Sequence, residues 1–275
     1  MLDDSRIRVL EKILEYEKKG EFNRDVENDL ETIPLLPNKI DYLSKNFFSK
    51  ISNKFANRIA ISYYERILKK GDFVISDICG VENFCNVKGG AVLTCNHFSV
   101  YDNYLVFKAI KKYLGKGKNL YKVIKEGNYT NYKGLFGFFF RHCNTLPLSS
   151  NTETMIKFLK SVKILLARGE KILIYPEQAM WWNYKKPRPM KNGAFRLAAT
   201  NNVPIIPIFI TMRDSDKTNS DGSIAQNYTI WILPPIYPTS NLSIKENTEY
   251  LKDENYRVWK EVYERVYGVK LVYSE

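Results

Sequence analysis

A histidine and an aspartate five positions apart are the residues of this 275-residue chain best suited to chemistry. His97 comes three positions after the apolar run 90–94, which predicts a short buried strand, and Asp102 stands where a helix would begin. An imidazole at the carboxyl end of a strand, with one ring nitrogen held by a carboxylate, can act as a general base. The alternative is structural: His97 would cap a turn, and Asp102 would be the N-cap of the helix.

A second acidic residue follows a strand in the same way. Glu177 comes just after the strand predicted at 171–175. Because the carboxyl ends of strands in an open α/β sheet meet at one crevice, we expect Glu177 and His97 to face the same cavity. Taken singly, Glu177 could also be a capping acid, and Gly193 could be a tight entry to a helix.

The elements that must position these residues alternate between strand and helix after residue 70. Strands are predicted at 72–78, 90–95, 120–124, 145–148, 171–175, 205–211 and 228–233, and helices at 102–114, 151–168, 193–201 and 249–267. The polar run 214–222 predicts a surface loop. This alternation indicates an α/β fold in which helices flank a central, mostly parallel sheet.

The N-terminal part of the chain has a different character. We predict an amphipathic helical segment over residues 1–70, followed by an α/β domain over residues 71–275. Between Ile40 and Ile59, large apolar residues recur every three to four positions with Lys and Arg between them. Such a basic amphipathic stretch suits an anionic membrane surface. Alternatively it packs on the following domain, and both hold if only its outer end touches lipid.

Composition narrows the partners and the compartment. A net charge of +12 favours polyanionic partners, but no nucleic-acid-binding signature accompanies it, so we expect an anionic membrane surface and no nucleic acid. No apolar run approaches the roughly 20 residues needed to cross a bilayer, and the N-terminus lacks the apolar core of a signal peptide. The four cysteines lack metal-type spacing, so we predict no metal and a cytoplasmic protein, peripheral on the inner face of the cell membrane.

Four blocks occur in a fixed order along the chain. They are N-H-x-x-x-x-D at 96–102, P-E at 176–177, K-x-G-A-F-R at 191–196 and V-P-I-I-P at 203–207. In this order and spacing the chain resembles the glycerolipid acyltransferase family, typified by the lysophosphatidic acid acyltransferases. The resemblance covers roughly residues 71–235, and the combination is more specific than any single block.

The resemblance implies a glycerol-3-phosphate acyltransferase-like fold and a role in phospholipid synthesis of the 1-acylglycerol-3-phosphate acyltransferase type. An acyl group would move from a thioester to a lipid hydroxyl, with His97 as general base and Asp102 orienting it. Acyl-coenzyme A or acyl carrier protein would be the donor, as a substrate rather than a bound cofactor. The residues implied to bind substrate are Asn96, Glu177, Lys191 and Gly193, together with Arg141 and Ser150.

The chain departs from the family where arginines are associated with the phosphate of the acceptor. Ser150 and Met180 occupy those two positions. A guanidinium holds phosphate through a two-pronged contact that Ser and Met cannot make. Arg141, Arg188 or the pair at 185–186 could supply the charge instead.

Three other functions remain open. The acceptor could carry a sugar or another polar head, stacked on an aromatic cluster formed by Trp181, Trp182 and Tyr184, although the same cluster could be a packed lid or a membrane-interface belt. The protein could be a membrane-binding relative that has lost catalysis. A thioester hydrolase would keep the same residues and pass the acyl group to water.

Overall fold

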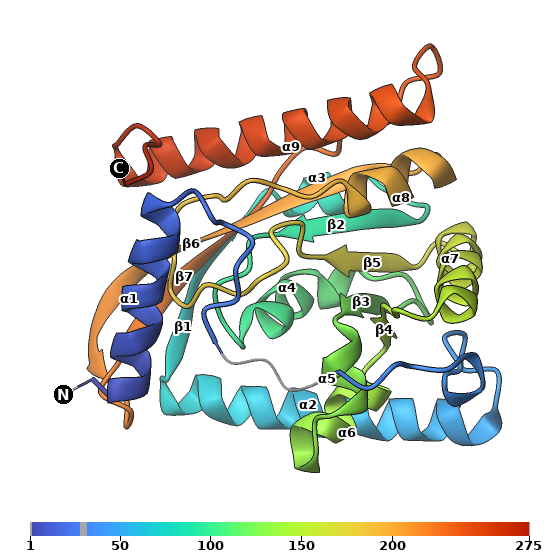
Figure 1. Ribbon diagram of the computed structural model, residues 1–275, viewed down its shortest axis with the longest axis horizontal. Coiled ribbons are helices and arrows are strands. Elements are labelled where there is room, and N and C mark those ends of the chain that lie inside the picture. The colour runs from blue at the N-terminus through green and yellow to red at the C-terminus, as the bar shows by residue number, and fades with distance from the viewer. Residues whose placement is uncertain (1, 28–31, 275) are drawn as a thin grey trace.

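The computed structural model describes residues 2–27 and 32–274 and has a seven-stranded sheet at its centre (Figure 1). The strands are β1 (Phe73–Cys79), β2 (Ala91–Cys95), β3 (Leu120–Ile124), β4 (Thr145–Pro147), β5 (Lys171–Ile174), β6 (Ile205–Thr218) and β7 (Ile224–Ile232). Their order across the sheet is β1-β7-β6-β2-β5-β3-β4. Neighbouring strands run parallel except for β6 and β7, which form an antiparallel hairpin. The predicted α/β fold with a mostly parallel sheet is confirmed.

The middle of the sheet is apolar on both faces because helices cover both. All five residues of β2 are buried. The side chains of its consecutive residues Val92 and Leu93 belong to two different hydrophobic clusters. A strand buried on both faces has no reason to alternate apolar and polar residues. This explains the continuous apolar run that precedes His97.

Two sets of helices form these covers. The C-terminal half of α2 (Phe47–Lys70), α3 (Val81–Cys85) and α4 (Asp102–Ile110) contribute to the cluster of Leu93. On the other face, α7 (Thr152–Ala167), α8 (Gly193–Asn201) and α9 (Ile244–Tyr267) contribute to the cluster of Val92. The remaining helices are α1 (Asp4–Lys18), α5 (Glu126–Thr130), α6 (Gly134–His142) and two short 3₁₀ turns at Pro37–Lys39 and Lys111–Tyr113.

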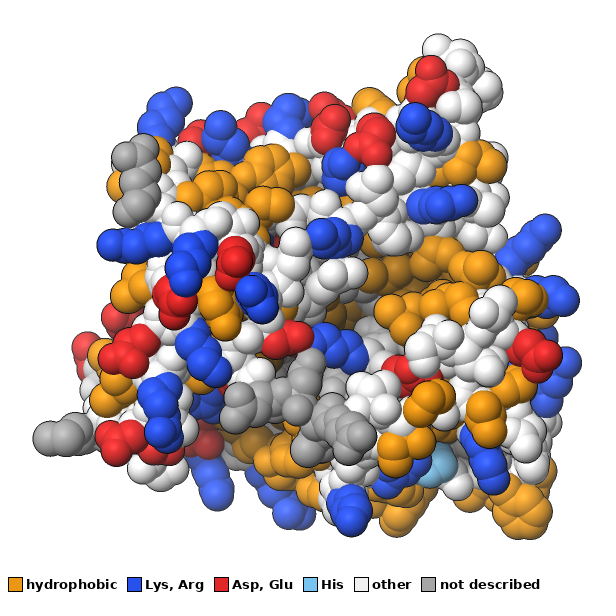
Figure 2. Space-filling view, in the orientation of Figure 1, with side chains coloured by type: hydrophobic (Ala, Val, Ile, Leu, Met, Phe, Trp, Pro, Cys, Tyr) orange, Lys and Arg blue, Asp and Glu red, His pale blue; other side chains and the backbone are white. Residues whose placement is uncertain are grey.

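The N-terminal half of α2 leaves large apolar side chains in solvent. We call the exposed residues Phe47, Phe48, Ile51 and Phe55 of α2, with Leu135 and Phe136 of the adjoining α6, the apolar edge. Figure 2 shows hydrophobic side chains mixed with Lys and Arg along this lower side of the molecule. Among residues 2–27 and 32–274, none of the helices has the length and apolar composition needed to cross a membrane.

The prediction of a loop at 214–222 is wrong: more than half of this polar run is strand. β6 continues to Thr218 and β7 begins at Ile224, so only a short turn separates them. The end of this hairpin has water on both sides: Arg213, Asp214 and Asp216 are exposed there. Strand ends that project beyond the core are polar because water surrounds them. Their composition is therefore the same as that of a surface loop.

Candidate active site

His97 and Asp102 form a hydrogen-bonded pair at the carboxyl end of β2. The His97 Nδ1 atom lies 2.6 Å from Oδ2 of Asp102, which is fully buried. The His97 side chain keeps 21% of its surface exposed. Within the described residues no protein group is hydrogen-bonded to Nε2. With Nδ1 protonated toward Asp102, Nε2 carries the lone pair that a general base uses.

Asp102 is not the helix cap that the structural alternative requires. Tyr101 occupies the N-cap position of α4, and Asp102 is the first helical residue. Its Oδ1 atom accepts the backbone N–H of Asn103 (2.7 Å), while Oδ2 faces the imidazole. The carboxylate is therefore used to hold His97.

Tyr175, which the sequence analysis did not single out, completes this arrangement. Its hydroxyl donates to Oδ1 of Asp102 at 3.0 Å. Its ring stacks on the His97 ring, with centroids 4.2 Å apart and planes inclined by 20°. Burial, followed by the charge of Asp102, raises the pKa of Tyr175, so the phenol stays protonated and able to donate. The sequence pointed to Tyr175 only through its position directly before Pro176 and Glu177.

Glu177 faces the protein instead of a substrate. It is 2% exposed, and its Oε2 atom accepts the backbone N–H of His97 at 3.0 Å. The backbone N–H of Arg188 donates to Oε1 at 2.7 Å, and the guanidinium donates to Oε2 at 3.1 Å. Because protein donors occupy both oxygens, we replace the predicted substrate contact with a role in anchoring the backbone of His97.

Arg188 is equally unavailable for an acceptor phosphate. It is 1% exposed, and besides Glu177 its guanidinium contacts the carbonyl oxygens of Phe22, Ala179 and His97. Asn96 also has a structural role in place of the predicted substrate contact. Its buried amide donates to the carbonyl of Ile210 (3.0 Å) and accepts the N–H of the same residue (2.8 Å), which ties the end of β2 to β6.

Four other predicted substrate-binding residues lie outside this cluster of interactions. Lys191 has an exposed side chain, and its backbone N–H donates to Pro176, while Gly193 is the exposed first residue of α8. The guanidinium of Arg141 binds the carbonyls of Tyr129 and Tyr132.

Ser150 lies beside a buried carboxylate. Its backbone N–H donates to Glu126, which also accepts the N–H of Leu35 and the hydroxyl of Ser149. An acceptor phosphate near Ser150 would meet the negative charge of Glu126. The position therefore differs in charge, as well as in shape, from one occupied by arginine.

The aromatic residues after β5 form a packed cover together with the N-terminus. Trp181 is fully buried with Val9 and Ile13 of α1, and its indole N–H donates to the carbonyl of Arg24 at 2.9 Å. Of the neighbouring lysines, Lys186 pairs with Glu17 at 2.5 Å. Trp181 therefore fits the packed-lid alternative.

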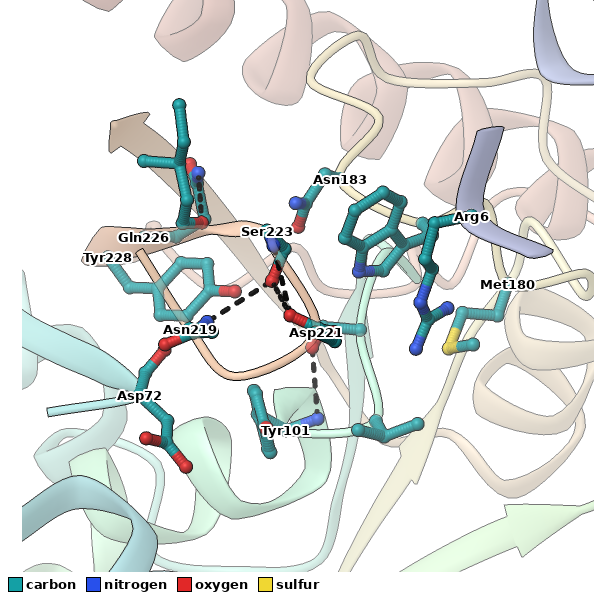
Figure 3. Close-up of a pocket in the computed structure, with 14 residues that line it drawn as sticks. Arg6, Asp72, Tyr101, Met180, Asn183, Asn219, Asp221, Ser223, Gln226 and Tyr228 are labelled. Carbon is teal, nitrogen blue, oxygen red and sulfur yellow. Dashed lines mark hydrogen bonds between the residues drawn. The ribbon is translucent and has the colours of Figure 1, made fainter. Parts of the chain in front are cut away.

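A polar pocket lies beside the loop that joins His97 to Asp102. It is lined by Ser99, Val100 and Tyr101 of that loop, by residues 180, 182 and 183, by Arg6 of α1, and by Asp72, Asn219, Asp221, Ser223, Ile224, Gln226 and Tyr228. Figure 3 shows Arg6 reaching in beside Met180. The Arg6 guanidinium lies over the Trp182 ring at 4.7 Å and pairs with Glu27 at 3.0 Å.

Comparisons with known proteins identify the family. A family model described as Acyltransferase matches residues 75–211, which include the His97–Asp102 pair, Tyr175 and Glu177. The chain belongs to the acyltransferase family. This confirms the predicted relationship to the glycerolipid acyltransferases.

Two relatives illustrate the extent of the similarity. This acyltransferase is 27% identical over 172 residues to the chloroplastic 1-acyl-sn-glycerol-3-phosphate acyltransferase BAT2 of Brassica napus, over 60% of this chain and 46% of that protein. The chain thus spans a little under half the length of that relative. In fold it is similar to PlsC, the 1-acyl-sn-glycerophosphate (LPA) acyltransferase of Thermotoga maritima, with a TM-score of 0.50 and 16% identity, over 81% of this chain and 98% of that one.

Proposed function

We propose that this acyltransferase moves an acyl group from a thioester to a lipid hydroxyl, with His97 as the general base. The observation that carries the proposal is the 2.6 Å contact between Nδ1 of His97 and buried Asp102, on an imidazole that remains partly exposed. A general base needs a neutral imidazole held in one orientation with its other nitrogen accessible. The membership in the acyltransferase family supports the same reaction class.

The chemistry requires no covalent enzyme intermediate. An alcohol is a weak nucleophile at neutral pH, so Nε2 of His97 takes its proton as the oxygen attacks the thioester carbonyl. The carbon–sulfur bond then breaks, and the proton passes to the leaving thiolate. Asp102 stabilises the imidazolium formed in between. Acyl-coenzyme A and acyl carrier protein are the thioesters that we propose as donors.

The apolar edge is the part of the surface that supports membrane association. Phe47 and Phe48 are 68% and 74% exposed, and basic residues Lys45, Lys50 and Lys54 are exposed around them. Large apolar side chains among cations favour the interface of an anionic bilayer. We propose a peripheral location on the cytoplasmic face of the cell membrane, where a lipid acceptor would be within reach.

A glycolipid-type acceptor is the second candidate, and the polar pocket favours it. Two carboxylates, Asp72 and Asp221, line this pocket. Asp72 lies 3.7 Å from Nζ of Lys217, Asp221 accepts from Ser223, and the one guanidinium that lines the pocket pairs with Glu27. Carboxylates repel a phosphate but accept hydrogen bonds from hydroxyl groups, and the Trp182 ring, over which Arg6 lies, adds an aromatic wall. An uncharged polyhydroxyl head therefore fits this pocket better than the head of 1-acylglycerol-3-phosphate.

The test is product analysis with labelled donors. Purified protein is incubated with labelled acyl-coenzyme A or acyl carrier protein and with 1-acylglycerol-3-phosphate, a glycolipid fraction or a whole membrane lipid extract. Acylated lipid, identified by mass spectrometry, supports the proposal and names the acceptor. Free fatty acid alone would indicate a thioester hydrolase, and an unreacted donor would indicate a non-catalytic relative.

The matched variants are His97→Ala and His142→Ala, which remove the two histidines of the chain one at a time. We expect His97→Ala to lower kcat/KM by about 10²–10⁴-fold, the usual contribution of a general base. Asp102→Asn should lose a comparable factor because it no longer fixes the tautomer. His142→Ala, on α6, should leave kcat/KM within twofold. Full activity in His97→Ala would disprove the mechanism.

A further inference from the structure

We propose that Tyr175 is a positioning residue for the His97–Asp102 pair: its hydroxyl fixes the Asp102 carboxylate and its ring supports one face of the imidazole. The assignment rests on the proposed role of His97 as general base. No other described side chain contacts both members of the pair in this way.

The hydroxyl of Tyr175 fixes the rotation of the Asp102 carboxylate. Oδ1 is held by Tyr175 at 3.0 Å and by the N–H of Asn103 at 2.7 Å, while Oδ2 is left to His97 at 2.6 Å. A carboxylate that turned about its bond would lose these contacts in a fully buried position. Oδ2 is therefore kept in line with Nδ1.

The ring of Tyr175 limits the motion of the imidazole. The two rings are nearly parallel, with centroids 4.2 Å apart, so a rotation of His97 about its side-chain torsions would break the stack. The stack and the Nδ1 contact together leave Nε2 pointing in one direction. A general base must be held within reach of the proton that it removes.

The sheet explains why Tyr175 sits beside His97. Strand β5 ends at Ile174, which pairs with Thr94 of the parallel neighbour β2. Tyr175 therefore leaves β5 where Cys95 ends β2, just before His97. Two residues further on, buried Glu177 holds this turn by accepting the backbone N–H of His97.

The charge of Asp102 sets the sign of the expected effect. Each donor to Asp102 takes up part of its negative charge. Without the tyrosine hydroxyl, more of that charge acts on His97 and stabilises the protonated imidazole, so the pKa of His97 should rise. The other titratable or charged groups around the pair are Tyr64 on α2, Cys95 on β2, Tyr228 on β7, and Glu177 and Arg188 after β5. None of these is altered in the variants below except Tyr64, which serves as a control.

The first readout is independent of turnover. The chain has two histidines, so ¹H–¹³C spectra of the ring ε1 positions contain two signals, and His142→Gln assigns them. In Tyr175→Phe, which keeps the ring, we expect the pKa of His97 to rise by about half a unit to one unit. Tyr64→Phe is the matched control, since Tyr64 is also half-buried and near Asp102 but has no hydrogen bond to it. The pKa of His97 in this variant should stay within 0.2 units, a margin of about 0.3 kcal/mol.

The second readout is catalysis. In Tyr175→Phe the acidic limb of the kcat/KM profile should move upward with the pKa of His97, and kcat above that limb should fall about tenfold, equivalent to about 1.4 kcal/mol, with little change in KM. Tyr175→Leu removes the ring stack as well as the hydroxyl, so its kcat should fall by more than that of Tyr175→Phe. Thermal unfolding of each variant establishes that it is folded.

The outcomes separate the two proposals. A His97 pKa and kcat in Tyr175→Phe that match the wild type overturn the role of Tyr175, as does an equal shift in Tyr64→Phe. A shifted pKa in a protein that acylates no lipid supports the positioning role and rejects the proposed function.

Discussion

The buried pair Glu177–Arg188 offers a sharp test of how the backbone of His97 is held. Glu177→Gln keeps the shape of the side chain and removes its charge. The variant leaves Arg188, which is 1% exposed, without its counter-charge. It also turns one acceptor oxygen into an NH₂ donor, which must face the backbone N–H of either His97 or Arg188.

The expected loss follows from these contacts. Removing one partner of a buried ion pair costs about 3–5 kcal/mol, because the other charge stays buried and uncompensated. Burial already lowers the pKa of Arg188, and the charge of Glu177 opposes this effect. For a chain of this size about 1 kcal/mol shifts Tm by about 2 °C, so Tm should fall by about 6–10 °C. A displaced His97 should also lower kcat, on the order of 10²-fold for a shift of about 1 Å.

The assay combines thermal unfolding with kcat measured well below the lowered Tm. Glu254→Gln is the control, since it removes the charge paired with exposed Arg257 at 2.8 Å and should leave both quantities unchanged. A Glu177→Gln protein with the wild-type Tm and kcat would refute the anchoring role. A lower Tm with unchanged kcat would show that the pair holds the loop but does not position His97.

Two further predictions concern the N-terminal half of the chain and its contacts. The double variant Phe47→Ser/Phe48→Ser should bind phosphatidylglycerol-containing vesicles at least about 100-fold more weakly, since each buried Phe contributes about 1.5–3 kcal/mol. Val272→Ser should leave binding unchanged, because Val272 is similarly exposed but lies next to the C-terminus, which Figure 1 shows on the opposite side of the sheet from α2. Equal binding by all three proteins in vesicle co-sedimentation would reject a membrane role for the apolar edge. Burial raises the pKa of Glu126, but hydrogen bonds from Leu35, Ser149 and Ser150 together hold it below its ordinary value of 4.5. The stabilisation by this charge is complete above pH 4.5 and is lost as the pH falls through the lower pKa of the folded protein. Glu126→Gln should therefore flatten the decline of the free energy of unfolding below pH 4.5, measured by urea titration. An unchanged slope would contradict the role given to these hydrogen bonds.

The sequence was sufficient for the parts of the fold that depend on local pattern. The apolar run before His97, the strand before Glu177 and the helix capped by Asn151 all occur where the periodicity predicted them. The short helices α3, α5 and α6 were not predicted. Five residues, as in α3 and α5, are too few to show a period, and α6 is a nearly continuous apolar run interrupted by glycine, which has no helical period to detect.

The candidate site was predictable in position but not in the roles of its residues. That Glu177 and Asn96 follow strands was visible in the sequence. Their partners were not, because Arg188 and the backbone of Ile210 reach them only through the folded chain. A polar residue in a family block can contact a substrate or hold the backbone, and only its hydrogen-bond partners distinguish these roles.

Both ends of the chain close over the loop that carries Glu177. The carbonyls of Phe22 and Arg24 accept the buried N–H groups of Arg188 and Trp181, and the hydroxyl of Tyr273 donates to Pro187. All three of these partners lie outside the stretch 75–211 that defines the family. The matched stretch therefore leaves out the partners of buried groups on the loop that carries Glu177. A catalytic fragment trimmed to the limits of homology would carry unsatisfied donors in its interior, and a swap of family domains must carry both termini with it.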